Sequence, residues 1–329
     1  PLFAQRIRQA ARHGCQVIAL DSVERDWAIP VKHLLKQAAS QWVQALGGIA
    51  AAVAQEKGVA GPAGSFVIDD AATAVARSLM AGERKAVLLG NAAAHHAQAA
   101  QLLALANWIG EHTGATVGYL TEAANTVGAQ FVGAHPVKGG LNAAQMLSGG
   151  LKAVLLLNNE PVHDSSAGAR ATDALSGAEM VVTLSPFKAN MEFSDVLLPI
   201  APFTETSGSF INAEGRLQSF HAVVRPLGDT RPAWKVLRVL ANMLEIPGFD
   251  FETSQDVLVR ATNAAPGAFS RIDATQLSNA VTGGVTASVS GAVGEPVVAS
   301  IYQLDGLVRR SPSLQLTADA RMAREEVAA

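Results

Sequence analysis

Short apolar runs that alternate with helical stretches constrain the fold of this chain most. Four such runs lie at residues 17–20, 86–89, 152–157 and 180–184. They are short for helices and almost free of polar side chains, as parallel strands covered on both faces should be. Apolar residues at helical spacing fill much of the sequence between them. This alternation predicts an α/β fold with doubly wound, mostly parallel sheets.

The helices between these strands are predicted from apolar spacing and from glycine or proline stops. They are expected at residues 2–13, 30–57, 69–80, 95–109, 167–175 and 254–262, and after Pro232. Gly110 is expected to end the helix at 95–109, because glycine readily adopts the left-handed conformation found at helix C-termini. Residues 210–220 are expected to form one extended segment that follows a short strand ending at Pro199.

Breaks in these patterns predict three parts. Residues 1–82 are interpreted as a partial Rossmann-like α/β domain, 83–248 as a second α/β domain, and 249–329 as a short C-terminal region. Pro296 lies in a Gly-, Ser- and Val-rich stretch at 282–300. There we expect irregular structure with edge strands. Because the chain starts in an expected helix without Met, it is interpreted as a portion of a longer polypeptide.

Composition excludes several classes of protein. The net charge is −3 and no basic tract occurs, which argues against a nucleic-acid partner. No apolar run approaches the roughly 18 residues of a membrane-spanning helix. The single cysteine, Cys15, allows no internal disulfide and cannot hold an iron–sulfur cluster, which takes about four thiolates. Its position just before an apolar strand predicts a small buried thiol.

Polar residues follow two of the predicted strands directly. Asn158, Asn159 and Glu160 come after the strand at 152–157, and Lys188 lies in the loop after 180–184. Ligands of open parallel sheets bind beyond the carboxyl ends of the strands. Position alone leaves open a dinucleotide contact or an ordinary turn. Glu160 argues against bound pyrophosphate because it adds a carboxylate there, and a lone loop lysine is usually solvated.

A second polar cluster is interpreted mainly as structural. It consists of Glu205, Asn212, Glu214 and Arg216. Paired carboxylates near an arginine can act as acid–base catalysts. The alternative, which we favour, is that Glu pairs with Arg and Asn bonds to the backbone, so that an irregular loop is held in place. No metal site is predicted, because the adjacent His95 and His96 would point about 100° apart on a helix.

The sequence around this cluster resembles the molybdopterin oxidoreductase family. The resemblance rests on residues 194–200, 204–216 and 227–235. The variant Ala-Glu-Gly-Arg at 213–216 and the segment 301–315 are similar to one branch of the family. This branch is an iron–sulfur subunit of the proton-pumping NADH-quinone oxidoreductase, or respiratory complex I. It keeps the fold of the family, and its molybdenum chemistry is thought to be lost.

This resemblance implies a non-catalytic scaffold that supports electron transfer from NADH to quinone elsewhere in the complex. It implies no catalytic residue, metal or cofactor in this chain, with iron–sulfur clusters in a separate N-terminal part and molybdopterin absent. Other peripheral-arm subunits would be the partners, on the cytoplasmic side of the bacterial inner membrane. The remains of a degenerate pocket would be Asn158, Asn159, Glu160, Lys188, Glu205, Asn212 and Arg216.

Two alternatives stay open at this point. The chain could belong to a working molybdopterin-dependent oxidoreductase, whose active site would be built partly from the loops at 158–161 and 204–216. It could instead be an independent nucleotide-binding module.

Overall fold

The computed structural model describes residues 2–24, 27–273, 275–280 and 300–321. The fold is α/β with small, mostly parallel sheets, as predicted. The described residues form two compact units, one from 2–124 and 275–280, the other from 125–273 and 300–321. The predicted edge strands at 282–300 lie outside the described residues, except for Ser300.

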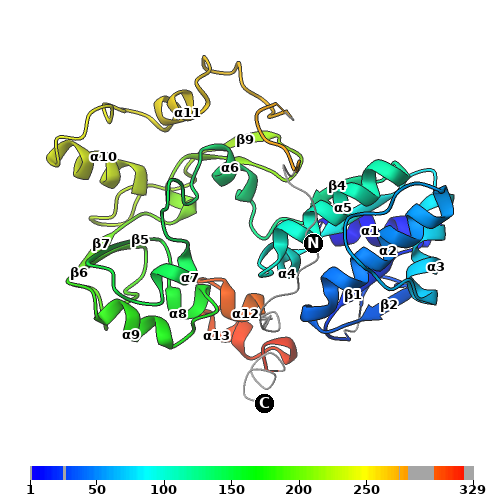
Figure 1. The fold of residues 1–329 in the computed structure, drawn as a ribbon. Helices are drawn as coiled ribbons and strands as arrows, with labels where there is room; N and C mark the ends of the chain where they lie inside the picture. Colours follow the sequence, from blue (N-terminus) through cyan, green and yellow to red (C-terminus); the bar gives the residue numbers. More distant parts are fainter. Residues whose placement is uncertain (1, 25–26, 274, 281–299, 322–329) are drawn as a thin grey trace. The chain divides into compact units, whose positions relative to one another are not determined.

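The first unit contains two parallel pairs of strands and a layer of helices (Figure 1). Strand β1 (Ile18–Asp21) pairs with β2 (His33–Lys36), and β3 (Ala86–Leu89) pairs with β4 (Thr116–Tyr119). The helical elements are α1 (Leu2–Arg12), the 3-10 turn η1 (Ala39–Gln41), α2 (Trp42–Lys57), α3 (Asp70–Ala81), α4 (Asn91–Ala94) and α5 (Ala99–Thr113).

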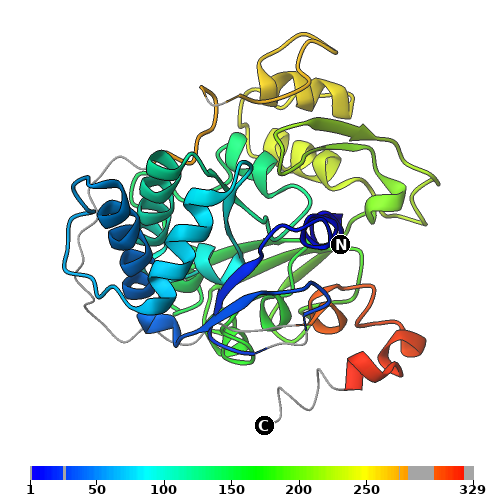
Figure 2. The ribbon, with the colours of Figure 1, turned by 90° about the vertical axis from the view of Figure 1, so that its right-hand side faces the viewer.

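The core of the first unit lies between its long helices. Helix α2 packs against both α3 and α5, and the three helices form one cluster in Figure 2. Val43, Val53, Leu105 and Ile109 are fully buried there. Burial of such side chains stabilises each by about 1.5–3 kcal/mol relative to an exposed position. These contacts therefore hold α5 against the helices that precede it in the chain.

The predicted helix at residues 30–57 is wrong over its first part. His33–Lys36 forms strand β2, and the helix α2 begins only at Trp42. The strand is fixed by its neighbour, because Lys32 N donates to Val17 O and Gln37 N donates to Asp21 O at the two ends of the pair. Pairing with β1 thus outweighs the local helical pattern, which is only a weak determinant.

Two predictions about single residues of this unit are also wrong. Helix α5 ends at Gly114, with φ of 77°, and Gly110 lies inside the helix. A Cβ at Gly110 would come within 2.6 Å of Cγ2 of Val117, so this glycine allows α5 to approach β4. Cys15 is exposed, because β1 starts later, at Ile18.

The second unit contains a parallel sheet, an antiparallel hairpin and short helices (Figure 1). Strand β6 (Met180–Ser185) lies between β5 (Ala153–Leu157) and β7 (Val196–Pro199), and the order is β5–β6–β7. The helices are α6 (Thr126–Phe131), α7 (Ala143–Met146), α8 (Pro161–Asp164), α9 (Arg170–Ser176), the 3-10 turn η2 (Phe203–Glu205), α10 (Ala233–Met243), α11 (Ser254–Thr262), α12 (Ile301–Leu304) and α13 (Pro312–Gln315).

The predicted extended segment at 210–220 is a hairpin. Strand β8 (Gly208–Ile211) pairs antiparallel with β9 (Leu217–Phe220). The turn between them contains Gly215, with φ of 81°, and Asn212, whose Oδ1 accepts two backbone hydrogen bonds. The prediction of one continuous segment is wrong because it neglects this turn, which the residues Asn and Gly favour.

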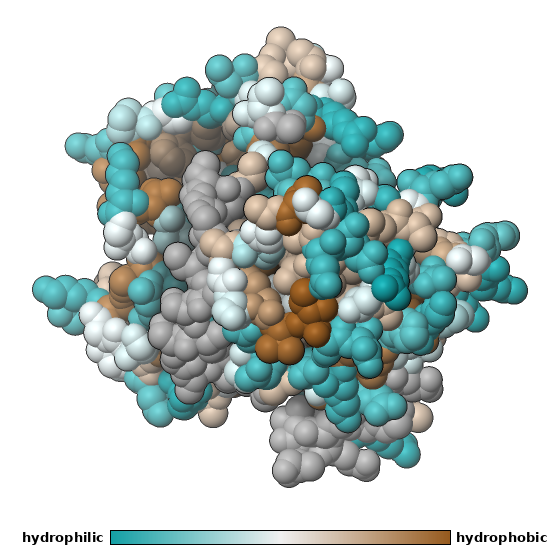
Figure 3. Space-filling view, turned by 45° about the vertical axis from the view of Figure 1, so that its right-hand side comes forward, coloured by the Kyte–Doolittle hydropathy of each residue, from teal (hydrophilic) through white to brown (hydrophobic). Residues whose placement is uncertain are grey.

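Among the described residues, strand β5 at the edge of the three-stranded sheet is covered on one face only. Val154, Leu156 and Val181 pack with Leu175 of α9 and Phe193. On the opposite face of β5, Leu155 is 49% exposed and Leu157 is 46% exposed. The expectation that residues 152–157 are covered on both faces is therefore wrong for the part of the chain that the structure describes. Apolar side chains also reach the surface in the space-filling view of Figure 3.

The contacts divide the chain differently from the sequence pattern. The predicted breaks are at residues 82 and 248, whereas the compact units separate at residue 124. The physical reason is that α5 shares one core with α2 and α3, so residues 83–124 belong with those before them. Within the described residues, no helix has the length and apolar character needed to cross a membrane.

Candidate functional site

The loops that follow β5 and β6 lie side by side at the carboxyl edge of the parallel sheet. Asn158 adopts the left-handed conformation, with φ of 49°, and its backbone N donates to Leu184 O at 2.8 Å. Asn190 Nδ2 donates to Asn159 O at 2.9 Å, which joins the two loops directly. The predicted residues of both loops are thus brought to one edge, where ligands of such sheets bind.

Glu160 binds two arginines from the C-terminal part of the chain. Its Oε1 lies 2.9 Å from Nη2 of Arg309, and its Oε2 lies 2.8 Å from Nη2 of Arg310. Arg309 also approaches Asp164 at 3.5 Å. The side chains of Glu160, Arg309 and Arg310 are 14%, 11% and 34% exposed. Each oxygen of one partly buried carboxylate therefore has its own guanidinium partner.

These arginines determine the charge state of Glu160. Burial raises the pKa of this carboxyl group, but hydrogen bonds from Arg310 and Arg309, together with their positive charges, outweigh burial and lower the pKa below its ordinary value. Glu160 is therefore an anion at neutral pH. An uncompensated carboxylate would oppose a bound pyrophosphate, whereas two arginines compensate this one.

Arg310 also connects the turn at 305–310 to the loop after β6. Its guanidinium carbon lies 4.2 Å from the ring centroid of Phe187, a distance that permits a cation–π interaction. Its Nη1 donates to Gly306 O at 3.0 Å. A Cβ at Gly306 would lie 3.5 Å from Phe187 and 3.8 Å from Glu160. The turn at 305–310 therefore lies directly against both strand-end loops.

Sequence reasoning identified Glu160 but missed its partners. The Arg309–Arg310 pair lies about half the chain away in sequence, and no local pattern relates it to Glu160. The available signal was the pair itself, two adjacent cations in a chain with only 16% charged residues. Lys188, the other predicted residue of this edge, is exposed. It makes no ion pair among the residues that the structure describes.

The second predicted cluster lies at the β8–β9 hairpin, where its contacts are with the backbone. Oε2 of Glu205 accepts from Leu227 N at 2.9 Å. Oδ1 of Asn212 accepts from Glu214 N at 3.0 Å and from Arg216 N at 2.9 Å. Glu214 and Arg216 are exposed. The expected Glu–Arg pair is not formed among the described residues, whereas the expected contacts of Asn with the backbone are present.

The two predicted clusters are not joined by any hydrogen bond or ion pair within the described parts of the chain. Glu160 binds the arginines at 309–310, and the hairpin cluster holds the turn at 212–216 and the backbone at Leu227. The seven candidate residues therefore form two separate groups, of which the edge group is the better candidate for a ligand.

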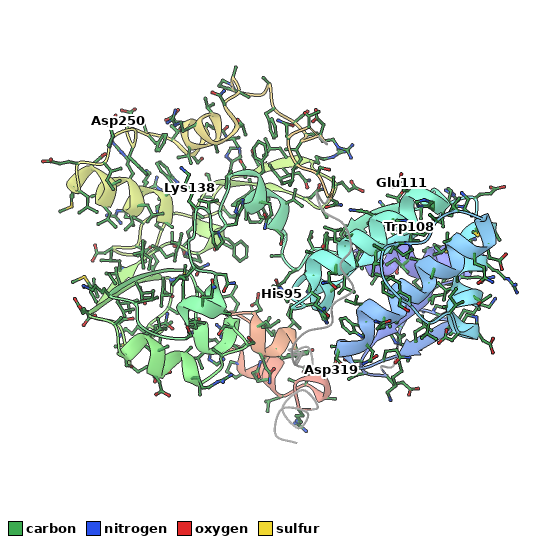
Figure 4. The ribbon with its side chains drawn as sticks, viewed as in Figure 1. His95, Trp108, Glu111, Lys138, Asp250 and Asp319 are labelled. Atoms are coloured by element: carbon green, nitrogen blue, oxygen red, sulfur yellow. The ribbon has the colours of Figure 1, made fainter. Side chains whose placement is uncertain are left out.

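The adjacent histidines of the first unit have different surroundings. Nε2 of His95, which is labelled in Figure 4, lies 2.8 Å from Oε2 of Glu122, and both side chains are exposed. His96 is buried and stacks on Trp42, its Nε2 facing Ala39 O at 3.0 Å. The two imidazole rings therefore face different protein partners. Among the described residues, no group of three His, Cys, Asp or Glu side chains is placed to hold a metal ion.

The chain is thus an α/β protein with parallel sheets and an antiparallel hairpin. Its candidate site lies at a sheet edge, in the loops at the strand ends. The chain belongs to the molybdopterin oxidoreductase family, which matches residues 1–243. It is 37% identical over 75 residues to a probable oxidoreductase of Bacillus subtilis (strain 168), a match that covers 23% of this chain and 8% of the relative. It is 42% identical over 59 residues to a putative formate dehydrogenase of Staphylococcus aureus (strain bovine RF122 / ET3-1), covering 18% of this chain and 6% of that protein.

The fold is also similar to a solved structure. Acetylene hydratase from Pelobacter acetylenicus matches with a TM-score of 0.54 and 12% identity, over 79% of this chain and 48% of that chain. At this identity the likeness concerns the fold alone. The chain spans about half the length of that structure and a smaller share of the relatives.

Proposed function

We propose that this chain is part of a molybdopterin-dependent oxidoreductase, and that the edge formed after β5 and β6 borders the cofactor. The observation that carries the proposal is the family match over residues 1–243. The names of two relatives, a probable oxidoreductase and a putative formate dehydrogenase, support a redox enzyme over a purely structural protein. Formate is accordingly the first substrate to try.

The charges at the edge are compatible with a phosphate-bearing cofactor. Arg309 and Arg310 pair with Glu160, and Arg309 also approaches the nearby Asp164, so both carboxylates have a cationic partner. Lys188 then adds a positive charge on the neighbouring loop. Since positive charge and amide donors favour phosphate groups, this donor set fits the anionic end of a dinucleotide.

The residues of the chain would bind and orient the cofactor. Lys188 would neutralise phosphate charge, and the exposed amides of Asn158 and Asn159 would donate or accept hydrogen bonds. The cofactor itself, when bound, supplies the two-electron redox chemistry through its metal. None of these residues is assigned a proton transfer. The remainder of the protein would provide the metal's own ligand and the substrate pocket.

A second candidate function is a scaffold within an iron–sulfur subunit of the NADH-quinone oxidoreductase. The observation that favours it is the C-terminal turn at 305–310, which lies against both strand-end loops. In this case molybdopterin would be absent, and iron–sulfur clusters would lie in another part of the same polypeptide. The partners would be other subunits of the peripheral arm, at the cytoplasmic side of a bacterial inner membrane.

One purification separates the two candidates. The intact protein is isolated from its own cells, and molybdenum, pterin, iron and flavin are assayed together with formate oxidation and NADH-quinone activity. We expect molybdenum and pterin near one per protein. Iron and flavin with NADH-quinone activity and no molybdenum would overturn the first candidate in favour of the second.

A further inference from the structure

The C-terminal residues 301–315, named here the strap, form a small self-supporting substructure. Nη1 of Arg309 donates to Gln303 O and Leu304 O, both at 2.8 Å. Nε2 of Gln315 donates to Tyr302 O and Val308 O, both at 3.0 Å. Helix α12 of the strap contacts α8, which follows Glu160, as Figure 1 shows. Hydrogen bonds within the strap thus fix the backbone that carries the two arginines.

Ion pairs and one cation–π contact join the strap to the sheet edge. Glu160 contacts both arginines, Asp164 contacts Arg309, and Phe187 lies under Arg310. Among the residues that the structure describes, Glu160 is the one with ion pairs to both guanidinium groups. Among the described contacts, its carboxylate is therefore the main link between the strap and the loop after β5.

The geometry of the arginine pair suits oxyanions in general. Guanidinium groups present planar sets of N–H donors that match carboxylate and phosphate oxygens. Here two of them converge on the two oxygens of a single carboxylate, at 2.9 and 2.8 Å. A phosphate group carries more negative charge than Glu160 and has additional oxygens, so it satisfies the same donors at least as well.

We infer that Arg309 and Arg310 form an oxyanion-binding site, which the carboxylate of Glu160 occupies in this structure. A ligand anion can displace this carboxylate. While Glu160 occupies the site, it holds the strap against the ends of β5 and β6. The ligand class is a small phosphate-bearing anion. This inference goes beyond the proposed function, because it concerns residues 301–315 and applies to either candidate.

Binding of inorganic pyrophosphate to the intact protein tests the site. Glu160→Gln removes the internal anion while keeping the size of the side chain, and we expect pyrophosphate to bind about tenfold more tightly by calorimetry. The matched control is Glu179→Gln, which changes an exposed carboxylate just before β6. Adding Arg309→Gln and Arg310→Gln to Glu160→Gln should remove the gain. Equal affinity in wild type and Glu160→Gln, or a gain that survives loss of both arginines, would overturn the inference.

Hydrogen exchange of the intact protein tests, without any ligand, whether Glu160 holds the strap against the sheet edge. Glu160→Gln should speed amide exchange across the strap by about tenfold, whereas Glu179→Gln should leave it unchanged. If Glu160→Gln does not fold, Arg310→Gln replaces it, because Arg309 then still pairs with Glu160 and a smaller increase is expected. Unchanged exchange across 301–315 in the folded variant would contradict the inference. Molybdenum content does not enter either experiment, so this inference and the proposed function can fail separately.

Discussion

At the scale of single residues, Glu160 determines the character of the candidate site. Its position after β5 could be predicted, but its charge environment depends on Arg309 and Arg310. Because each of its oxygens pairs with an arginine, the carboxylate that seemed to oppose an anionic ligand becomes one member of a compensated group. The electrostatics of this edge are thus a property of the folded chain.

The pKa shift of Glu160 predicts a dependence of stability on pH. Its pKa is lowered on folding from an ordinary value of 4.5, so its stabilising contribution is complete above that value and is lost as pH falls through the lower folded pKa. The difference in thermal midpoint between wild type and Glu160→Gln should therefore be largest near neutral pH and shrink below about pH 4.5. A difference independent of pH would contradict the ion pair.

Gly110 is a second residue with a specific structural role. Alanine there would place a Cβ 2.6 Å from Cγ2 of Val117 and 2.9 Å from Ala115 O. We expect Gly110→Ala to destabilise the first unit by about 1–3 kcal/mol in urea unfolding, because α5 must move away from β4. Gly118→Ala is the control, since its Cβ would meet no atom within 4 Å. Equal effects of the two changes would refute the close approach.

At the scale of elements, the helices and strands that could be predicted from the sequence are those with a local sequence pattern. The boundaries of β3 and α11 match the predicted residues, 86–89 and 254–262, since each has a clear start and end. Strand β2 was missed because its partner strand, β1, determines it. The β8–β9 hairpin was missed although Asn212 and Gly215 favour its turn locally, because residues 210–220 were interpreted as one extended segment. The strap was missed for the same reason as β2, since distant contacts hold it.

The hairpin turn provides a test at this scale. Asn212→Ala removes the acceptor of two backbone N–H groups, so we expect a loss of about 1–2 kcal/mol in the free energy of unfolding. Arg216→Ala removes an exposed side chain without an ion pair in the described structure, and its effect should stay within about 0.5 kcal/mol. Chemical denaturation of both variants measures the contrast. A larger loss for Arg216→Ala would restore the predicted Glu–Arg pair as the stabilising contact.

At the scale of the whole molecule, the chain carries the fold of a family but only part of the length of its relatives. One face of β5 carries the exposed apolar side chains Leu155 and Leu157. The sequence predicted this fold class and family from the strand pattern and the motif at 204–216. Neither pattern determines whether a cofactor is bound, because that depends on groups brought together at the sheet edge.

The measurement that tests this account most directly is a cryo-EM map of the intact protein at the carboxyl edge of β5 and β6. The account predicts density for a pterin dinucleotide bordered by Asn158, Asn159 and Lys188. Density at this edge explained entirely by the loops and the strap, with Glu160 between Arg309 and Arg310, would contradict the proposed cofactor site. That result would identify this part of the chain as a scaffold.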